Sequence, residues 1–147
     1  MIPKISFFVA GIPKPAGSKR GFFIPKLKRV VITDACKGSK DWKTDVKHAA
    51  QECYGGELLA GPLEVTLTFH VERPTGHFRT GKNSVALRDS APQFPTTRPD
   101  VLKLARAVED ALTKIIWKDD SQIVTERLRK RYSARPGVQI DIMEAIE

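Results

Sequence analysis

Residues 100–115 carry the helical pattern that most constrains the fold of this 147-residue chain. Apolar side chains recur at positions 101, 104, 105, 108, 112 and 115, a spacing of three and four that places them on one face of an α-helix. Asp100, which follows Pro99, is a natural N-cap for this helix. A helix with one apolar stripe has to bury it against another layer, so the chain must supply a sheet or further helices to cover it.

The other elements follow from hydrophobic periodicity and turn residues. Residues 39–56 have helical spacing, with Ser39 as the N-cap and Gly55 just past the end, and residues 62–72 alternate as a half-buried strand does. Further strands are expected at residues 5–11, 22–33 (a hairpin with its turn at 25–29), 121–133 and 138–146, the last two as antiparallel partners. This order predicts an α+β fold in which two helices pack on a mixed sheet, within a single domain spanning residues 1–147.

Residues 73–98 form a long segment with several prolines and little periodicity. A structureless stretch of this length is uncommon in a compact domain unless it is functional or disordered. Its charged residues are almost all basic, with Asp89 as the one acidic residue. We expect a flexible basic loop that becomes ordered on its partner, with plain disorder as the alternative.

Cysteine content and hydropathy exclude several classes of protein. The chain has two cysteines, Cys36 and Cys53, without the spacing of a zinc site or a disulfide framework, which fits a reducing cytoplasm. No stretch is long and apolar enough to span a membrane, and the apolar N-terminal run is interrupted by proline, so we expect a first strand rather than a signal peptide. We therefore expect a cytoplasmic protein without a membrane partner or a small-molecule cofactor.

The net charge of +8 points to a polyanionic partner, because lysines and arginines displace the counterions that condense on nucleic acids. Residues 14–29 are rich in basic side chains and contain no acidic one, which suits a nucleic-acid-binding arm, although a solvated loop would have the same composition. Residues 121–133 alternate so that three arginines share one face of the strand and Lys130 lies on the other. We expect nucleic-acid contacts from Lys14, Lys19, Arg20, Arg79, Arg98, Lys103, Arg127, Arg129, Lys130 and Arg131.

Three aspartates, Asp100, Asp119 and Asp120, flank the helix at residues 100–115. Asp100 fits an N-cap, and Asp119 and Asp120 fit turn positions, so each has an ordinary structural explanation. Gathered at the ends of one helical hairpin in a basic chain, they also fit a cation site. Because a helix of ~15 residues keeps its ends ~20 Å apart, Asp120 can meet Asp100 only if the following strand returns beside the helix start or a second subunit contributes.

The same stretch resembles the RusA-type endodeoxyribonucleases, small phage-derived resolvases of four-way DNA junctions. Their usual pattern is P-D-x-D-N-L-x-K-x-x-x-D-A-L, followed by W-x-D-D-x-Q-V and a basic strand that contains a lysine. The matching residues here are Pro99, Asp100, Leu104, Arg106 (at the lysine), Asp110, Ala111, Leu112, Trp117, Asp119, Asp120, Gln122, Ile123 and Lys130. Residues 11–20, "GIPKPAGSKR", are similar to the family's proline-rich and basic N-terminal loop, and the resemblance extends over the whole chain.

The resemblance implies a RusA-like fold and a homodimer that nicks opposite strands of a four-way junction symmetrically with Mg²⁺, for which Mn²⁺ could substitute. It makes Asp100 and Asp120 metal ligands, Asp119 a neighbouring carboxylate and Arg106 the counterpart of a catalytic lysine. Mg²⁺ prefers one or two carboxylates together with water and phosphate oxygens, which agrees with this set. An arginine can hold a phosphate oxygen but cannot exchange a proton as a lysine with a lowered pKa can.

The chain departs from the family pattern at Leu102, which replaces the second aspartate, and at Lys103, which replaces asparagine. Glu109 lies in the same helical row as Leu102, roughly 10 Å further along the axis, and is a candidate replacement ligand. The alternative for Glu109 is an i,i+3 ion pair with Arg106. Two hypotheses for the function therefore remain: a metal-dependent junction endonuclease, and as the alternative a catalytically impaired protein that binds branched DNA with the same fold.

Overall fold

The computed structural model describes residues 4–16, 19–24, 29–34 and 39–146, and the side chains of residues 4–16 and 41–146. Its elements follow the expected order of strands and helices. In chain order they are β1 (Lys4–Ala10), β2 (Lys19–Ile24), β3 (Arg29–Asp34), α1 (Ser39–Cys53), β4 (Leu63–Val71), the 3₁₀ turns η1 (Thr75–His77) and η2 (Gly81–Asn83), α2 (Val101–Leu112), η3 (Asp120–Gln122), β5 (Ile123–Tyr132) and β6 (Gly137–Glu144).

The main sheet has four strands in the order β1-β6-β4-β5. β6 is antiparallel to both β1 and β4, whereas β5 is parallel to β4, so the sheet is mixed and the α+β prediction is confirmed. The prediction that residues 138–146 pair with residues 121–133 is wrong, because β4 lies between β5 and β6. The connection from β4 to β5 crosses over through α2, so β5 lies parallel to β4. β6 then pairs with the opposite side of β4.

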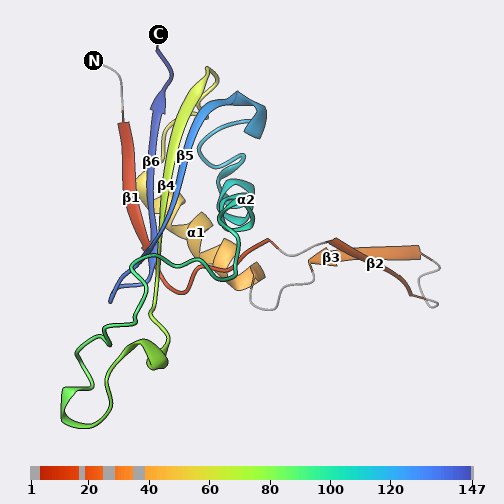
Figure 1. Ribbon diagram of the computed structural model, residues 1–147. Coiled ribbons are helices and arrows are strands. Elements are labelled where there is room, and N and C mark those ends of the chain that lie inside the picture. Colours follow the sequence, from red (N-terminus) through yellow and green to blue (C-terminus); the bar gives the residue numbers. More distant parts are fainter. Residues whose placement is uncertain (1–3, 17–18, 25–28, 35–38, 147) are drawn as a thin grey trace.

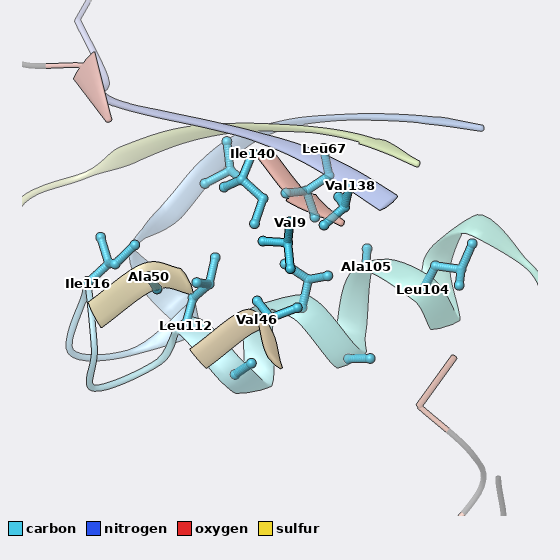
Figure 2. Packing of buried hydrophobic residues seen from close by; sticks show 14 of the residues in the cluster. Val9, Val46, Ala50, Leu67, Leu104, Ala105, Leu112, Ile116, Val138 and Ile140 are labelled. Carbon is cyan, nitrogen blue, oxygen red and sulfur yellow. The ribbon is translucent and has the colours of Figure 1, made fainter. Parts of the chain in front are cut away.

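Both helices cover one face of this sheet (Figure 1). Leu67, Val138 and Ile140 of the sheet point toward Leu112 of α2 and Val46 of α1 in the layer below them (Figure 2). The apolar stripe predicted for residues 100–115 forms much of this core: its buried members are Leu104, Ala105, Val108 and Leu112.

The helix α2 ends at Leu112 and not near residue 115. Lys114 has a left-handed backbone with φ of 69°, and its N–H donates to the carbonyl of Trp117 at 2.6 Å, so the chain turns sharply here. Ile116 and Trp117 still reach the core and are fully buried. The helix therefore ends about one turn before the predicted end, and a tight turn, not a further helical turn, buries the next apolar residues.

The hairpin of β2 and β3 projects from the body of the molecule as a separate two-stranded sheet (Figure 1). It confirms the predicted pairing within residues 22–33, while residues 25–28 of the predicted turn, and the side chains of Lys19 and Arg20, lie outside the described part of the chain.

Residues 73–98 also project from the body (Figure 1). The segment is not structureless: it contains η1, η2 and an antiparallel bridge between Phe78 and Leu87. Its ordering on a partner stays a prediction. Within the residues that the structure describes, no helix combines the length and the apolar character needed to cross a bilayer.

Candidate functional site

The N-terminal end of α2 carries Asp100 in a small hollow. Asp100 occupies the N-cap position, as predicted, but its side chain makes no capping hydrogen bond, so the carboxylate does not cap the helix. The hollow measures about 280 Å³ and is lined by Pro15, Arg98, Pro99, Asp100 and Lys103. The oxygens of the Asp100 carboxylate can bind a cation in this hollow, and Arg98 and Lys103 can bind an anion beside it.

Two backbone anchors build this hollow. The amide of Ala16 donates to the carbonyl of Lys103 at 2.9 Å, which ties the N-terminal loop, with Lys14 and Pro15, to the first turn of α2. On the other side, the ammonium group of Lys130 donates to the carbonyls of Thr97 and Pro99 at 2.9 and 3.0 Å. Lys130 therefore holds the segment that leads directly into Asp100.

Next to the C-terminal end of α2, the 3₁₀ turn η3 carries Asp120 in a network of hydrogen bonds. Its Oδ1 atom accepts hydrogen bonds from the hydroxyl of Thr113, at 2.5 Å, and from the indole N–H of Trp117, at 3.2 Å. The carbonyl of Glu109 lies 2.8 Å from the same hydroxyl oxygen, so the single hydroxyl proton of Thr113 is shared between Glu109 and Asp120. The carboxylate of Asp120 is thus aimed by two donors, one of which belongs to a buried indole ring.

Asp119 fixes the turn that presents Asp120. Its side chain accepts from the amide of Ser121 at 2.8 Å, and Gln122 returns the interaction as the partner in a capping box. The hydrogen bond from the Ser121 amide lowers the pKa of the Asp119 carboxyl. Gln122 also donates to the carbonyls of Leu59 and Gly61 at 2.8 and 3.0 Å. The turn interpretation therefore accounts for Asp119, and its role as a metal ligand stays a prediction.

The two ends of α2 do not meet within one chain. From Asp100 to Thr113 the helix rises ~20 Å at 1.5 Å per residue. β5 does run back beside α2, but it brings Lys130 to the Asp100 end and leaves Asp120 at the other. Within the described part of the chain, no group of three or more His, Cys, Asp or Glu side chains could hold a metal ion.

Between the two ends, α2 exposes Leu102 and Arg106, and Leu102 retains 67% of its accessible surface. Among the described residues no ion pair joins Arg106 to Glu109, and Oε1 of Glu109 is buried without a hydrogen-bond partner. The ion pair with Arg106, which is the alternative interpretation of Glu109, is therefore not formed. Glu109 lies one turn from Thr113, ~6 Å along the axis, so it is nearer the Asp120 end than the Asp100 end.

The predicted arginine face of β5 is confirmed. Arg127, Arg129 and Arg131 are exposed and lie opposite Thr66, Thr68 and His70 of β4, on the sheet face that no helix covers. Burial, with a smaller contribution from Arg131, lowers the pKa of His70, so this histidine adds no charge to the arginine row at neutral pH.

The loop arginines are engaged within the loop. Arg79 pairs with Asp89 at 3.0 Å and donates to the carbonyl of Leu87 at 3.2 Å. Arg73 donates to the carbonyl of Pro92 at 2.7 Å and lies 4.4 Å above the ring centroid of Tyr132. These contacts shape the loop, and nucleic-acid binding by Arg79 stays a prediction.

A further cavity of about 250 Å³ adjoins the Asp100 hollow, and sequence reasoning missed it. Its wall includes Ile12, Tyr132 and five prolines that are scattered along the chain: Pro13, Pro74, Pro95, Pro99 and Pro136. The prolines were the available signal, but a sequence pattern does not reveal that separate loops meet.

Comparison with known proteins gives two findings. The family model described as Endodeoxyribonuclease RusA matches residues 13–143, which include both ends of α2 and β5. The chain is also 34% identical over 143 residues, covering 95% of its length and 96% of the relative, to the protein named Uncharacterized protein YqaN of Bacillus subtilis (strain 168).

Proposed function

This chain belongs to the RusA family of endodeoxyribonucleases, and on that premise we propose that it resolves four-way DNA junctions as a metal-dependent homodimer. The observation that carries the proposal is the open hollow at the start of α2, where the uncapped carboxylate of Asp100 lies with Arg98 and Lys103. A phosphate bound by the two cations would lie beside the carboxylate, as a bridging divalent ion requires.

The donor set fits Mg²⁺. Asp100 is exposed and its carboxylate is free of the helix cap, and Asp120 is exposed and held in one orientation by Thr113 and Trp117. When bound, the ion would supply an activated water and neutralise charge at the scissile phosphate. Arg106, exposed on the same helix, offers a planar guanidinium for a non-bridging phosphate oxygen.

The separation of the two carboxylates supports the proposed dimer. In an isologous dimer the same patch is used by both subunits, so a two-fold axis near the middle of α2 exchanges the two helix ends. Asp100 then lies beside Asp120 of the partner subunit, and the dimer contains two equivalent sites. Leu102 and Val124 support this surface as an interface, because they expose 67% and 61% of their apolar side chains at opposite ends of the α2–β5 edge.

The second candidate is a branched-DNA-binding protein with impaired catalysis. Leu102 favours it, because an exposed apolar side chain stands where the family pattern has an aspartate. In that case the arginine face of β5 and the cations around Asp100 would bind phosphates, which position a protein on DNA without specifying sequence.

The test uses a synthetic four-way junction and a matched duplex, with Mg²⁺, Mn²⁺ or EDTA, analysed on native and denaturing gels. We expect symmetric, metal-dependent nicks in the junction alone, and their loss in Asp120→Asn while junction binding persists. Asp45→Asn, which changes an exposed carboxylate of α1, is the control and should cut as the wild type does. A junction that is bound but never cut with either metal would exclude the nuclease and favour the second candidate.

A further inference from the structure

The cavity of about 250 Å³ next to Asp100 has an apolar lining and a charged rim. Its walls come from the N-terminal loop, the end of β4, the segment before α2, the end of β5 and the turn before β6. The prolines and the ring of Tyr132 offer flat apolar surfaces. The charged residues of the lining are two cations, Arg98 and Lys130, and one acid, Glu72, so the cations outnumber the acid. Such a lining suits a ligand that is planar and uncharged in one part and anionic in another.

The cavity shares Arg98 and Pro99 with the hollow that contains Asp100 and Lys103. A ligand that filled both would have its planar part among the prolines and its anionic part at Asp100, with only this dipeptide between them. A nucleotide has this composition, because its base is planar and its phosphate is charged.

We propose that this cavity receives one unstacked nucleobase of the bound DNA while an adjoining phosphate occupies the hollow at Asp100. The inference rests on the proposed function, because it takes the DNA at a branch point as the ligand. Bases at the crossover of a junction lack part of their stacking, so placing one in a cavity costs less than it does within a duplex. The cavity would then select branched DNA over duplex next to the site of cleavage.

The walls of the cavity are held before any ligand binds. Lys130 bonds the carbonyls of Thr97 and Pro99, which fixes the segment on one side. Tyr132 lines both this cavity and a second hollow that contains Arg73, so its ring lies between the two. Arg73 lies over the ring at 4.4 Å and His77 meets it edge-on at 5.4 Å. A wall fixed in this way loses little conformational freedom when a base stacks on it.

Ile12 allows the cavity to be blocked without disturbing the core. It lies on the cavity wall and exposes 59% of its surface, so Ile12→Trp should fill the opening with a larger side chain. Ile146 exposes 65% of its surface and is not part of the wall, so Ile146→Trp is a matched control. If Ile12→Trp does not fold, Thr97→Trp blocks the cavity from its other side, where Thr97 is exposed.

The experiment measures the affinity of each protein for junctions in which one nucleotide at a time around the crossover is abasic. For the wild type and Ile146→Trp, one abasic position should weaken binding about tenfold, as expected for the loss of one stacked base. For Ile12→Trp, the intact junction should bind about tenfold more weakly, and the same abasic position should cause no further loss. 2-Aminopurine at that position should change its fluorescence on binding the wild type or Ile146→Trp but not on binding Ile12→Trp, because only an open cavity moves the base out of the DNA stack.

Single-stranded oligonucleotides, intact and fully abasic, separate this inference from the proposed function. One outcome would be that the wild type binds junctions no better than duplex but prefers the intact oligonucleotide, and that Ile12→Trp removes this preference. The cavity would then receive a base, and the proposed recognition of junctions would be wrong. If every abasic junction binds as tightly as the intact one, or Ile12→Trp retains the tenfold difference, the cavity does not receive a base and the inference is wrong. In that case a tighter dimer in the wild type than in Ile12→Trp would identify an apolar side chain of a second copy as its occupant.

Discussion

At its N-terminal end, α2 presents Asp100 in an open hollow, whereas at its C-terminal end Asp120 is bound by Thr113 and Trp117. Asp100 makes no capping bond, and its position depends on Lys130, which holds the preceding backbone. Asp120 is oriented directly, through its own carboxylate. One carboxylate is therefore positioned through the main chain and the other through side chains.

This difference matches two tasks that a divided site would need. A group aimed by two donors keeps its geometry without a ligand, as a preorganised metal ligand should. A carboxylate in an open hollow beside cations remains accessible to a bulky phosphodiester. The ends complement each other, and a site that uses both requires two chains because α2 separates them by ~20 Å.

The largest expected effect comes from mixing two inactive variants. Asp100→Asn and Asp120→Asn should each reduce junction cleavage by more than about a hundredfold, since loss of a ligand exceeds the 10- to 100-fold cost of altering a supporting residue. Mixed dimers of the two variants contain one site with both aspartates and one with neither, so the mixture should regain nicking of one strand.

The readout is the count of nicked strands per junction on a denaturing gel after the two proteins have exchanged subunits. Mixing either variant with itself is the control. If the mixture stays inactive although mixed dimers form, both aspartates act within one chain and the shared site is wrong.

Removing the donor at the Asp120 end should have the next largest effect. Thr113→Val keeps the shape of the side chain but removes the hydroxyl proton shared between Asp120 and the carbonyl of Glu109, and the oxygen that accepts from the indole N–H of Trp117 at 3.2 Å. We expect cleavage to fall about 10- to 100-fold with a higher Mg²⁺ requirement, as for other partners that orient metal ligands. The free energy of unfolding should fall by about 1 kcal/mol. Thr125→Val, at an exposed position of β5, is the matched control for the Mg²⁺ titration and the urea melt.

The corresponding change at the Asp100 end is Lys130→Met, which removes the bonds to Thr97 and Pro99 but keeps the aliphatic stem. We expect about a tenfold loss of cleavage, smaller than for Thr113→Val because Asp100 itself is not touched. Amide hydrogen exchange of residues 97–100 should quicken. Arg129→Met, on the opposite face of the same strand, should leave that exchange unchanged and weaken DNA binding with a shallower salt dependence.

Local patterns predicted much of this arrangement. The stripe containing Leu104 and Val108 and the arginine face of β5 follow from periods of 3.6 and 2, which depend only on near neighbours. The partner of β6 could not be predicted in this way, because alternation indicates which face is buried but not which strand lies alongside.

The site shows the same limit. The motif points to Asp100 and Asp120, but the helix length leaves open whether the following strand or a second subunit would bring them together. The cavity behind Asp100 could not be predicted, because Ile12, Pro74, Tyr132 and Pro136 come from loops and strand ends that meet only in the folded chain. The roles of Thr113 and Gln122 also depend on the shape of a turn, and their spacing from the aspartates does not specify it.

The smallest expected effect concerns Glu126 on β5, the strand that joins the two ends. The side chain is exposed at the surface, and partial desolvation of its carboxyl raises the pKa above the ordinary value of 4.5. The folded state therefore binds the carboxyl proton of Glu126 more tightly than the unfolded chain does. The contribution of Glu126 to the free energy of unfolding is greatest below pH 4.5, and it is lost as the pH rises through the higher pKa of the folded state. Glu126→Gln removes the ionisation and should melt at a higher temperature than the wild type at pH 7, with the difference shrinking toward pH 4. Thermal melts across this range measure it, with Glu57→Gln at an exposed position as the control. A difference that grows as the pH falls would show that the ionised carboxylate stabilises the fold, and the α2–β5 edge would then be better solvated than its burial indicates.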